Sequence, residues 1–122
     1  MKARVREMTA RSKGWSLTHV VKTLRRYLLG WQGYFRLAET PSVFADLDGW
    51  IRRRLRALII YQCRHGRKLF RVLRARGVPT HAAASAARHS RRYWAIAAHV
   101  ALSIAFPTQY FETLGVPRLG PA

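Results

Sequence analysis

The sequence predicts an all-α protein, and three observations favour this class. Apolar residues recur at spacings of three and four over long stretches, as one buried face of a helix requires. Residues that commonly begin or end helices stand at the boundaries of these stretches. Alternation typical of a half-buried strand is weak, although residues 93–96 are also compatible with an extended segment. The 122 residues are 49% hydrophobic, enough for a packed core.

Two helices are predicted in the N-terminal third of the chain. Residues 2–12 place Val5 and Met8 three apart among charged residues, which predicts a short amphipathic helix that Gly14 ends. Ser16 has a side chain suited to capping the next helix. That helix has an apolar stripe formed by Leu17, Val20, Val21, Leu24, Leu28, Trp31 and Phe35.

A third, longer helix is predicted to begin at Pro41. Thr40 stands at the cap position, and proline at the first helical position loses nothing by lacking an N–H. Asp46 and Asp48 fall in the early turns, where the helix dipole favours carboxylates. We expect Gly66 to end this helix. Its apolar face consists of Phe44, Leu47, Ile51, Leu55, Leu58, Ile59 and, at the same spacing, Gln62.

Shorter helices are predicted in the second half of the chain. A basic helix extends to Arg76, and Gly77-Val78-Pro79 then forms a turn. Thr80 is expected to cap an alanine-rich helix over residues 81–88, whose small side chains let a neighbour approach closely.

The C-terminal part is predicted to contain one helix over residues 95–106 on propensity, followed by a last helical turn after Pro107 that Gly115 closes. We divide the chain into residues 1–66 and residues 67–122, with one continuous domain as the alternative.

The charge balance favours a polyanionic partner. Lysines and arginines number 23 against five acids, which gives a formal charge of +18 and opposes compaction by self-repulsion. Four of the 23 are lysines (Lys2, Lys13, Lys22 and Lys68), which leaves 19 arginines. Because the planar guanidinium fits phosphate oxygens and stacks on bases, this bias favours RNA or DNA over simple solvation.

The densest positive charge lies at residues 52–56, where four of five positions are arginine. A solvated helix face usually mixes charge signs, but here Asp48 is the one acid in reach, and it reaches Arg52. We therefore predict contact with RNA phosphates rather than solvation alone. The full set of predicted RNA-binding residues is Arg52, Arg53, Arg54, Arg56, Lys68, Arg71, Arg74, Arg91 and Arg92.

The aromatic and glycine residues at positions 30–35, together with Trp50, are interpreted as packing elements. Large aromatic rings mainly contribute buried area, which favours a core position for Trp31, Phe35 and Trp50; Tyr34 lies off the stripe and fits either core or surface. Gly30 and Gly33 lie within a predicted helix at a cost of about 0.5–1 kcal/mol each. We expect close helix–helix approach to offset that cost.

The sequence gives no catalytic centre. Asp46 and Asp48 are two apart on a helix, so they point in different directions and cannot hold a metal pair by themselves. Cys63, His65 and the other histidines lack a common zinc spacing. No Walker or dinucleotide glycine pattern occurs. We therefore expect no catalytic residue, no metal and no cofactor.

Location is also constrained. The longest apolar run, residues 93–106, is too short to span a bilayer, and the first residues are too polar for a secretory signal. The single cysteine suits a reducing compartment. We expect a cytoplasmic protein without a membrane partner.

Several segments together resemble the C-terminal part of group II intron reverse transcriptase/maturases, over about residues 6–119. The signature combines Gly30 and Trp31 with Tyr34 and Phe35, and then Leu47, Asp48, Trp50, Ile51 and the arginines 52–54 and 56. Further similar segments are residues 6–16, 73–79, 90–94 and 101–119.

The resemblance implies a helical thumb-like bundle followed by shorter helices of the maturase-specific region. It implies binding of structured group II intron RNA to assist splicing and retromobility, and contact with an RNA–DNA duplex. The polymerase carboxylates of the family belong to fingers and palm segments that we do not find here. Two alternatives stay open: a piece that completes a split reverse transcriptase with a separate fingers/palm polypeptide, and a basic structural RNA-binding protein.

Overall fold

The computed structural model describes residues 1–10, 14–36 and 41–119, without the side chains of residues 32–36 and 41. All regular secondary structure in this part of the chain is helical, which confirms the all-α class. The helices are α1 (Lys2–Met8), α2 (Leu17–Arg36), α3 (Pro41–Cys63), α4 (Gly66–Ala75), α5 (Thr80–Arg88), α6 (Tyr93–Ala97), α7 (Val100–Ala105) and α8 (Thr108–Leu114).

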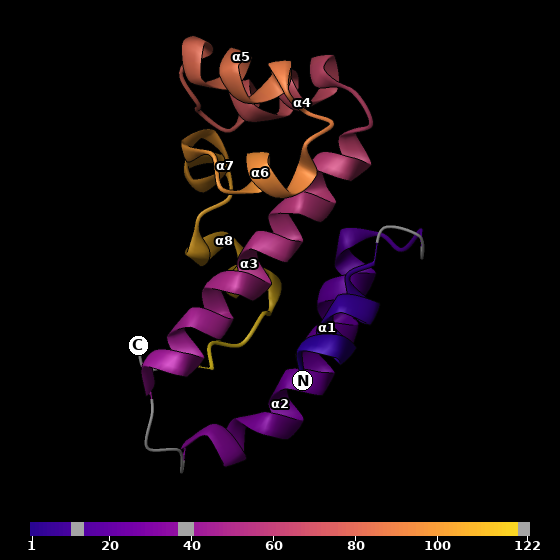
Figure 1. The fold of residues 1–122 in the computed structure, drawn as a ribbon, viewed down its shortest axis with the longest axis vertical. Coiled ribbons are helices and arrows are strands. Elements are labelled where there is room, and N and C mark those ends of the chain that lie inside the picture. The colour runs from indigo at the N-terminus through magenta and orange to yellow at the C-terminus, as the bar shows by residue number, and fades with distance from the viewer. Residues whose placement is uncertain (11–13, 37–40, 120–122) are drawn as a thin grey trace.

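Helix α3 is the central element of the fold. Figure 1 shows α1 and α2 along one side of α3, with α6, α7 and α8 along the other and with α4 and α5 at its C-terminal end. Helix α3 packs most extensively against α6, and it also contacts α2 and α4. Helices α4 and α5 form a second close pair. The long helix thus connects elements from both ends of the sequence.

The buried apolar side chains form one cluster around α3. Leu24 and Leu28 of α2, Leu55 of α3 and Phe111 of α8 are each at most 1% exposed. Each such side chain contributes about 1.5–3 kcal/mol relative to an exposed one. The cluster includes residues from both parts of the chain, and the division at residues 66 and 67 stays a prediction.

The N-terminal helices follow the sequence pattern. Val5 and Met8 are the buried residues of α1, as their spacing predicts. Gly14 has a φ of +66°, a left-handed conformation that glycine adopts at no steric cost. The hydroxyl of Ser16 accepts a hydrogen bond from the backbone N–H of His19 at 3.2 Å, which confirms the cap of α2.

The end of α3 differs from the prediction. The helix ends at Cys63, and the chain reverses at Arg64, whose φ of 71° costs about 1 kcal/mol in a non-glycine residue. His65 then caps α4, since its ring nitrogen accepts from the backbone N–H of Lys68. Gly66 is the first residue of α4, not the end of α3.

Gly66 has a packing function instead. A Cβ atom placed on it would lie 2.6 Å from the carbonyl oxygen of Ala87 at the end of α5. Real Cβ atoms do not approach this closely, so glycine is needed for the contact of α4 with α5. Ala82, Ala83 and Ala86 are the buried residues of α5, consistent with the close approach expected of alanines.

The turn between α4 and α5 forms as predicted, with a φ of +90° at Gly77. The expected cap at Thr80 is wrong by one residue. Thr80 is already helical, and the cap position belongs to Pro79, which has no side-chain hydrogen bond to give.

The single helix predicted over residues 95–106 is also wrong, because His99 interrupts it. The backbone at His99 is extended, and its Nδ1 accepts a hydrogen bond from the N–H of Ala101 at 3.0 Å. The side chain thereby starts α7 anew. Residues 93–96, for which an extended segment was the alternative, are helical. The last helix ends at Gly115 with a φ of +112°, as predicted.

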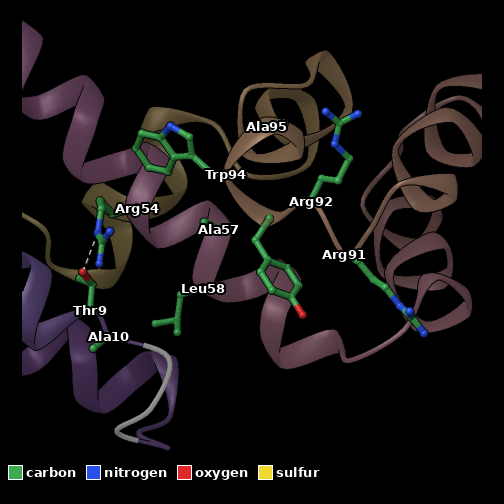
Figure 2. Close-up of a pocket in the computed structure, with 10 residues that line it drawn as sticks. Thr9, Ala10, Arg54, Ala57, Leu58, Arg91, Arg92, Trp94 and Ala95 are labelled. Carbon is green, nitrogen blue, oxygen red and sulfur yellow. Dashed lines mark hydrogen bonds between the residues drawn. The ribbon is translucent and has the colours of Figure 1, made fainter.

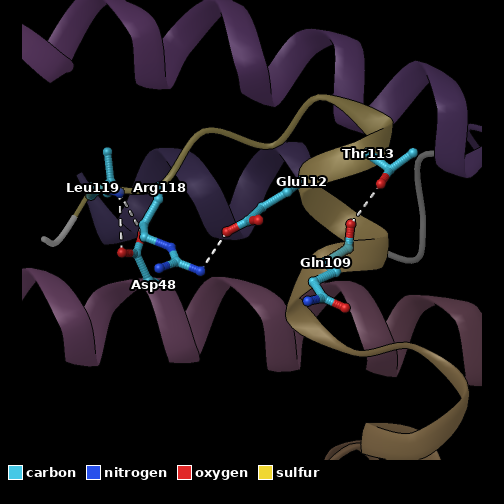
Figure 3. Close-up of polar contacts among 6 residues, drawn as sticks. All are labelled: Asp48, Gln109, Glu112, Thr113, Arg118 and Leu119. Atoms are coloured by element: carbon cyan, nitrogen blue, oxygen red, sulfur yellow. Dashed lines mark hydrogen bonds and ion pairs between the residues drawn. The ribbon is translucent and has the colours of Figure 1, made fainter. Parts of the chain in front are cut away.

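The C-terminal segment returns along α3 towards its N-terminal half (Figures 1 and 3). Asp48 is 6% exposed, and its carboxylate accepts from the backbone N–H of Leu119. Asp48 is therefore held by the C-terminal segment, a contact that its sequence position did not predict. On the same segment, Arg118 pairs with Glu112.

The packing expected of Gly30 is not found. Among the described residues, no atom outside its own helix backbone lies within 4 Å of a Cβ placed on Gly30, so no described helix approaches closely there. Gly33, Tyr34 and Phe35 lie outside the described side chains. None of the described helices is long and apolar enough to cross a membrane.

Candidate nucleic-acid interface

The sequence between Asp48 and Glu112 contains no acidic residue. This segment covers most of α3 and everything up to α8. Its cations are Arg52, Arg53, Arg54, Arg56, Arg64, Arg67, Lys68, Arg71, Arg74, Arg76, Arg88, Arg91 and Arg92. Because no carboxylate within the segment compensates them, these residues create a continuous positive potential over the helices that carry them.

Three arginines of α3 connect this helix to other elements. Arg53 donates two hydrogen bonds to the carbonyl oxygen of Trp94, at 3.0 and 2.7 Å, and its guanidinium lies 4.0 Å from the centre of the Trp94 ring. Arg54 donates to the hydroxyl of Thr9 at 3.0 Å, as Figure 2 shows, and to the carbonyl oxygen of Arg6. These contacts attach α6 and α1 to α3.

Arg56 makes a third connection of this kind. Its Nε donates to the carbonyl oxygen of Phe106 at 2.9 Å, and its guanidinium lies 5.6 Å from the ring centre of Phe111. Burial lowers the pKa of Arg56, and the neighbouring positive charge of Arg52 lowers it further. A guanidinium titrates so far above neutral pH that it stays charged in spite of this shift.

Further arginines also bind backbone carbonyls. Arg76 donates to Ala105, and its guanidinium lies against the rings of Phe106 and Tyr110. Arg74 donates to Val78 at 2.8 Å and Arg25 donates to Gly115 at 2.9 Å. Among the described side chains, six arginines donate to a carbonyl oxygen: Arg25, Arg53, Arg54, Arg56, Arg74 and Arg76.

Trp50 is half-buried and surrounded by cations. The amino group of Lys2 lies 5.3 Å from the centre of its ring, and the guanidiniums of Arg6 and Arg54 lie at 5.5 and 5.8 Å. Contacts of this kind stabilise by about 0.5–1 kcal/mol each at exposed sites. Trp50 thus links α1 to α3 through these contacts, and it also packs against the core.

The remaining predicted RNA-binding residues have side chains that make no hydrogen bond or ion pair within the described part of the chain. Lys68, Arg71, Arg91 and Arg92 are exposed, and Arg52 is half-buried. The structure describes no side-chain hydrogen bond or ion pair for any of them within residues 1–10, 14–36 and 41–119. Arg64, Arg67 and Arg88 share these properties. Sequence reasoning missed these three because it followed dense runs; the acid-free segment is the signal that includes them.

A groove of about 760 Å³ lies between three elements and brings the predicted residues Arg54, Arg91 and Arg92 together (Figure 2). Its walls come from the end of α1, from Ala57 and Leu58 of α3, and from α6 with the loop before it. Arg91 and Arg92 extend in different directions from this loop in Figure 2. Trp94, which Arg53 holds, is 42% exposed at the same groove. The groove therefore combines free guanidiniums with an exposed aromatic ring.

Comparison with known protein families settles the relationship. The model of the group II intron maturase-specific domain matches residues 1–77. The chain belongs to this family. The match spans α1 to α4 and the turn at Gly77, and it includes the arginine run of α3. A search of curated proteins gives no match.

The maturase signature residues occupy different environments in this maturase-specific domain. Ile51 is buried in the core, while Trp31 and Leu47 are half-buried and pack against it. Gly30 is exposed. The core role predicted for Trp31 agrees with this packing, whereas the side chains of Tyr34 and Phe35 are not described.

The maturase-specific domain is not a polymerase domain. The acids of this chain fit that statement, because Asp48 is buried against the Leu119 backbone while Asp46 is exposed. Within the described residues, no group of three or more His, Cys, Asp or Glu side chains is placed to hold a metal ion. Two of the histidines, His65 and His99, cap helices.

Proposed function

We propose that this maturase-specific domain binds structured group II intron RNA through the phosphate backbone and assists the folding of that RNA for splicing. The observation that carries the proposal is the set of cations in the acid-free segment whose side chains make no hydrogen bond or ion pair with the described residues. Arg64, Arg67, Lys68, Arg71, Arg88, Arg91 and Arg92 belong to this set, together with the half-buried Arg52.

The chemistry favours a phosphate backbone as the ligand. Each phosphate that an arginine or lysine neutralises releases condensed counterions, so binding gains free energy from the salt solution. A folded RNA presents many phosphates at fixed spacing, and recognition then depends on shape more than on base edges. An RNA–DNA duplex presents a similar backbone, so we include it among the ligands of this surface.

Polymerase activity is not part of this proposal. We infer that the chain has no catalytic centre of its own, because its acids are few, separated, and in the case of Asp48 engaged with backbone. A separate polypeptide with fingers and palm remains a proposed partner for reverse transcription.

The test is binding of intron RNA at two salt concentrations. We expect affinity to fall by about 10³-fold between 50 and 200 mM salt if six or more phosphates are contacted. The double change Arg91→Gln and Arg92→Gln should weaken binding and reduce the salt slope by about one for each lost contact.

The matched control is Lys22→Gln with Arg26→Gln on α2, which removes the same charge from a helix on the other side of α3 (Figure 1). It should reduce binding much less. An affinity that does not depend on salt, or equal weakening by both double variants, would contradict the proposal.

A further inference from the structure

Helices α4 and α5 line a second, open groove, distinct from the one in Figure 2. Its volume is about 760 Å³, and its lining includes Arg67, Phe70, Arg71, Ala84, Ala87 and Arg88. None of these residues lines the first groove. The family model ends at residue 77, so it includes the α4 side of the groove and not the α5 side.

The groove is built from two matching helix faces. Arg67, Phe70 and Arg71 follow at spacings of three and four on α4, and therefore share one face. Ala84, Ala87 and Arg88 repeat the same spacing on α5. The close approach of Gly66 to Ala87 fixes the separation of the two helices at one end. Small alanine side chains on one wall leave the space open.

Positive charge surrounds this space without compensation. Arg67, Arg71 and Arg88 are exposed, and within the described part of the chain their side chains make no hydrogen bond or ion pair. All three lie within the segment that contains no acid. Three guanidiniums at one groove repel each other, and an anionic ligand would relieve this repulsion.

The wall between the charges is apolar. Phe70 is half-buried, and it packs against the core while it lines the groove. A duplex backbone gains nothing from an aromatic ring, because its bases are paired and stacked inside the helix. An unpaired nucleotide has both a phosphate for the guanidiniums and a base face for the ring.

We propose that the α4–α5 groove binds an unpaired segment of RNA, with phosphates on Arg67, Arg71 and Arg88 and a base stacked on Phe70. The inference rests on the proposed function, since it assigns a single-stranded part of the same RNA to a second site. It extends that function from the backbone of folded RNA to exposed bases.

The experiment measures binding of a short oligouridylate, of the same strand without bases, and of a duplex of equal length, by fluorescence anisotropy. Phe70→Leu keeps the apolar volume and removes the π face. We expect it to weaken oligouridylate binding about tenfold, within the range of base–aromatic stacking, and to leave baseless-strand and duplex binding unchanged. The matched control Phe44→Leu changes a half-buried ring of α3 outside the groove and should have no effect.

A second variant tests the charges separately. Arg67→Gln with Arg71→Gln and Arg88→Gln changes exposed side chains, so the helical circular dichroism should be retained. It should weaken binding of both the oligouridylate and the baseless strand. Unchanged oligouridylate affinity in Phe70→Leu, or binding of polyglutamate by the wild type as tightly as oligouridylate, would overturn the inference.

These outcomes separate the two proposals. Salt-dependent binding of intron RNA together with no effect of Phe70→Leu would leave the proposed function intact and remove the single-strand site. Weak, salt-independent binding of the intron RNA would contradict the proposed function itself, whatever the oligouridylate result.

Discussion

The carboxylate of Asp48 accepts hydrogen bonds from the backbone N–H of Leu119 with both oxygens, at 2.9 and 3.1 Å. The two residues are 71 positions apart, and both are buried. The contact connects the second turn of α3 with the segment that follows α8. It places the C-terminal segment against the central helix, in the part of the chain beyond the family match.

We expect Asp48→Ala to destabilise the protein by about 1–3 kcal/mol, because the buried N–H of Leu119 would lose its acceptor. Urea unfolding followed by circular dichroism measures this change. The matched control is Asp46→Ala, which removes an exposed acid two residues away and should change the free energy of unfolding by less than about 0.5 kcal/mol. Similar losses in the two variants would show that the Leu119 contact is not the cause.

Two glycine substitutions are expected to have opposite effects. Gly66→Ala should destabilise by about 1–3 kcal/mol, since the added Cβ would meet the Ala87 carbonyl at 2.6 Å and force α4 and α5 apart. Gly30→Ala enters open space on α2 and should stabilise by about 0.5–1 kcal/mol, because alanine favours the helix. Thermal unfolding of both variants tests the pair; a stabilising Gly66→Ala would refute the close contact.

Arg53 and Arg92 should separate stability from RNA binding. Arg53→Gln removes two hydrogen bonds and the stacking on Trp94, so we expect a loss of about 1 kcal/mol of stability. Arg92→Gln should leave stability within about 0.5 kcal/mol and should weaken binding of the RNA. Unfolding midpoints and RNA affinities, measured on both variants, give the comparison. If Arg92→Gln were the less stable variant, this division of roles would be wrong.

Cys63 should make stability depend on alkaline pH. Burial raises the pKa of its thiol, so the folded state favours the neutral form. The contribution is fully present below the unfolded thiol pKa of about 8.5, and it is lost as the pH rises through the higher folded value. We therefore expect the free energy of unfolding of the Cys63→Ala variant to fall less than that of the wild type as the pH rises from about 8 to about 10. Parallel loss in both proteins would exclude Cys63 as the cause.

The helices were predictable because their signals are local. The spacing of Leu24 and Leu28, or of Ile51 and Leu55, depends only on the pitch of a helix, and all four residues are buried. The interruption at His99 was missed, since propensity favours a continuous helix there and the ring that caps α7 is not a common cap residue. The partner of Asp48 was missed because it is distant in sequence.

The candidate site was predictable only in part, because local charge can be read from the sequence and distant partners cannot. Lys68, Arg71, Arg91 and Arg92 are exposed, as an RNA-binding role requires, and that role stays a prediction. For Arg53, Arg54 and Arg56, the sequence showed only that acids were absent. Their partners are mostly backbone carbonyl oxygens of other elements. Every residue has a carbonyl oxygen, so no residue type in the sequence indicates where such a partner lies.

The six arginines that donate to carbonyl oxygens have one more consequence. A carbonyl is a dipole without net charge, so these contacts connect the helices and leave the full charge of each guanidinium in place. An arginine that pairs with a carboxylate, as Arg118 does with Glu112, forms a pair without net charge. These arginines therefore hold the helices together and still contribute to the long-range positive field that attracts a polyanion. Folding of the chain does not weaken that field.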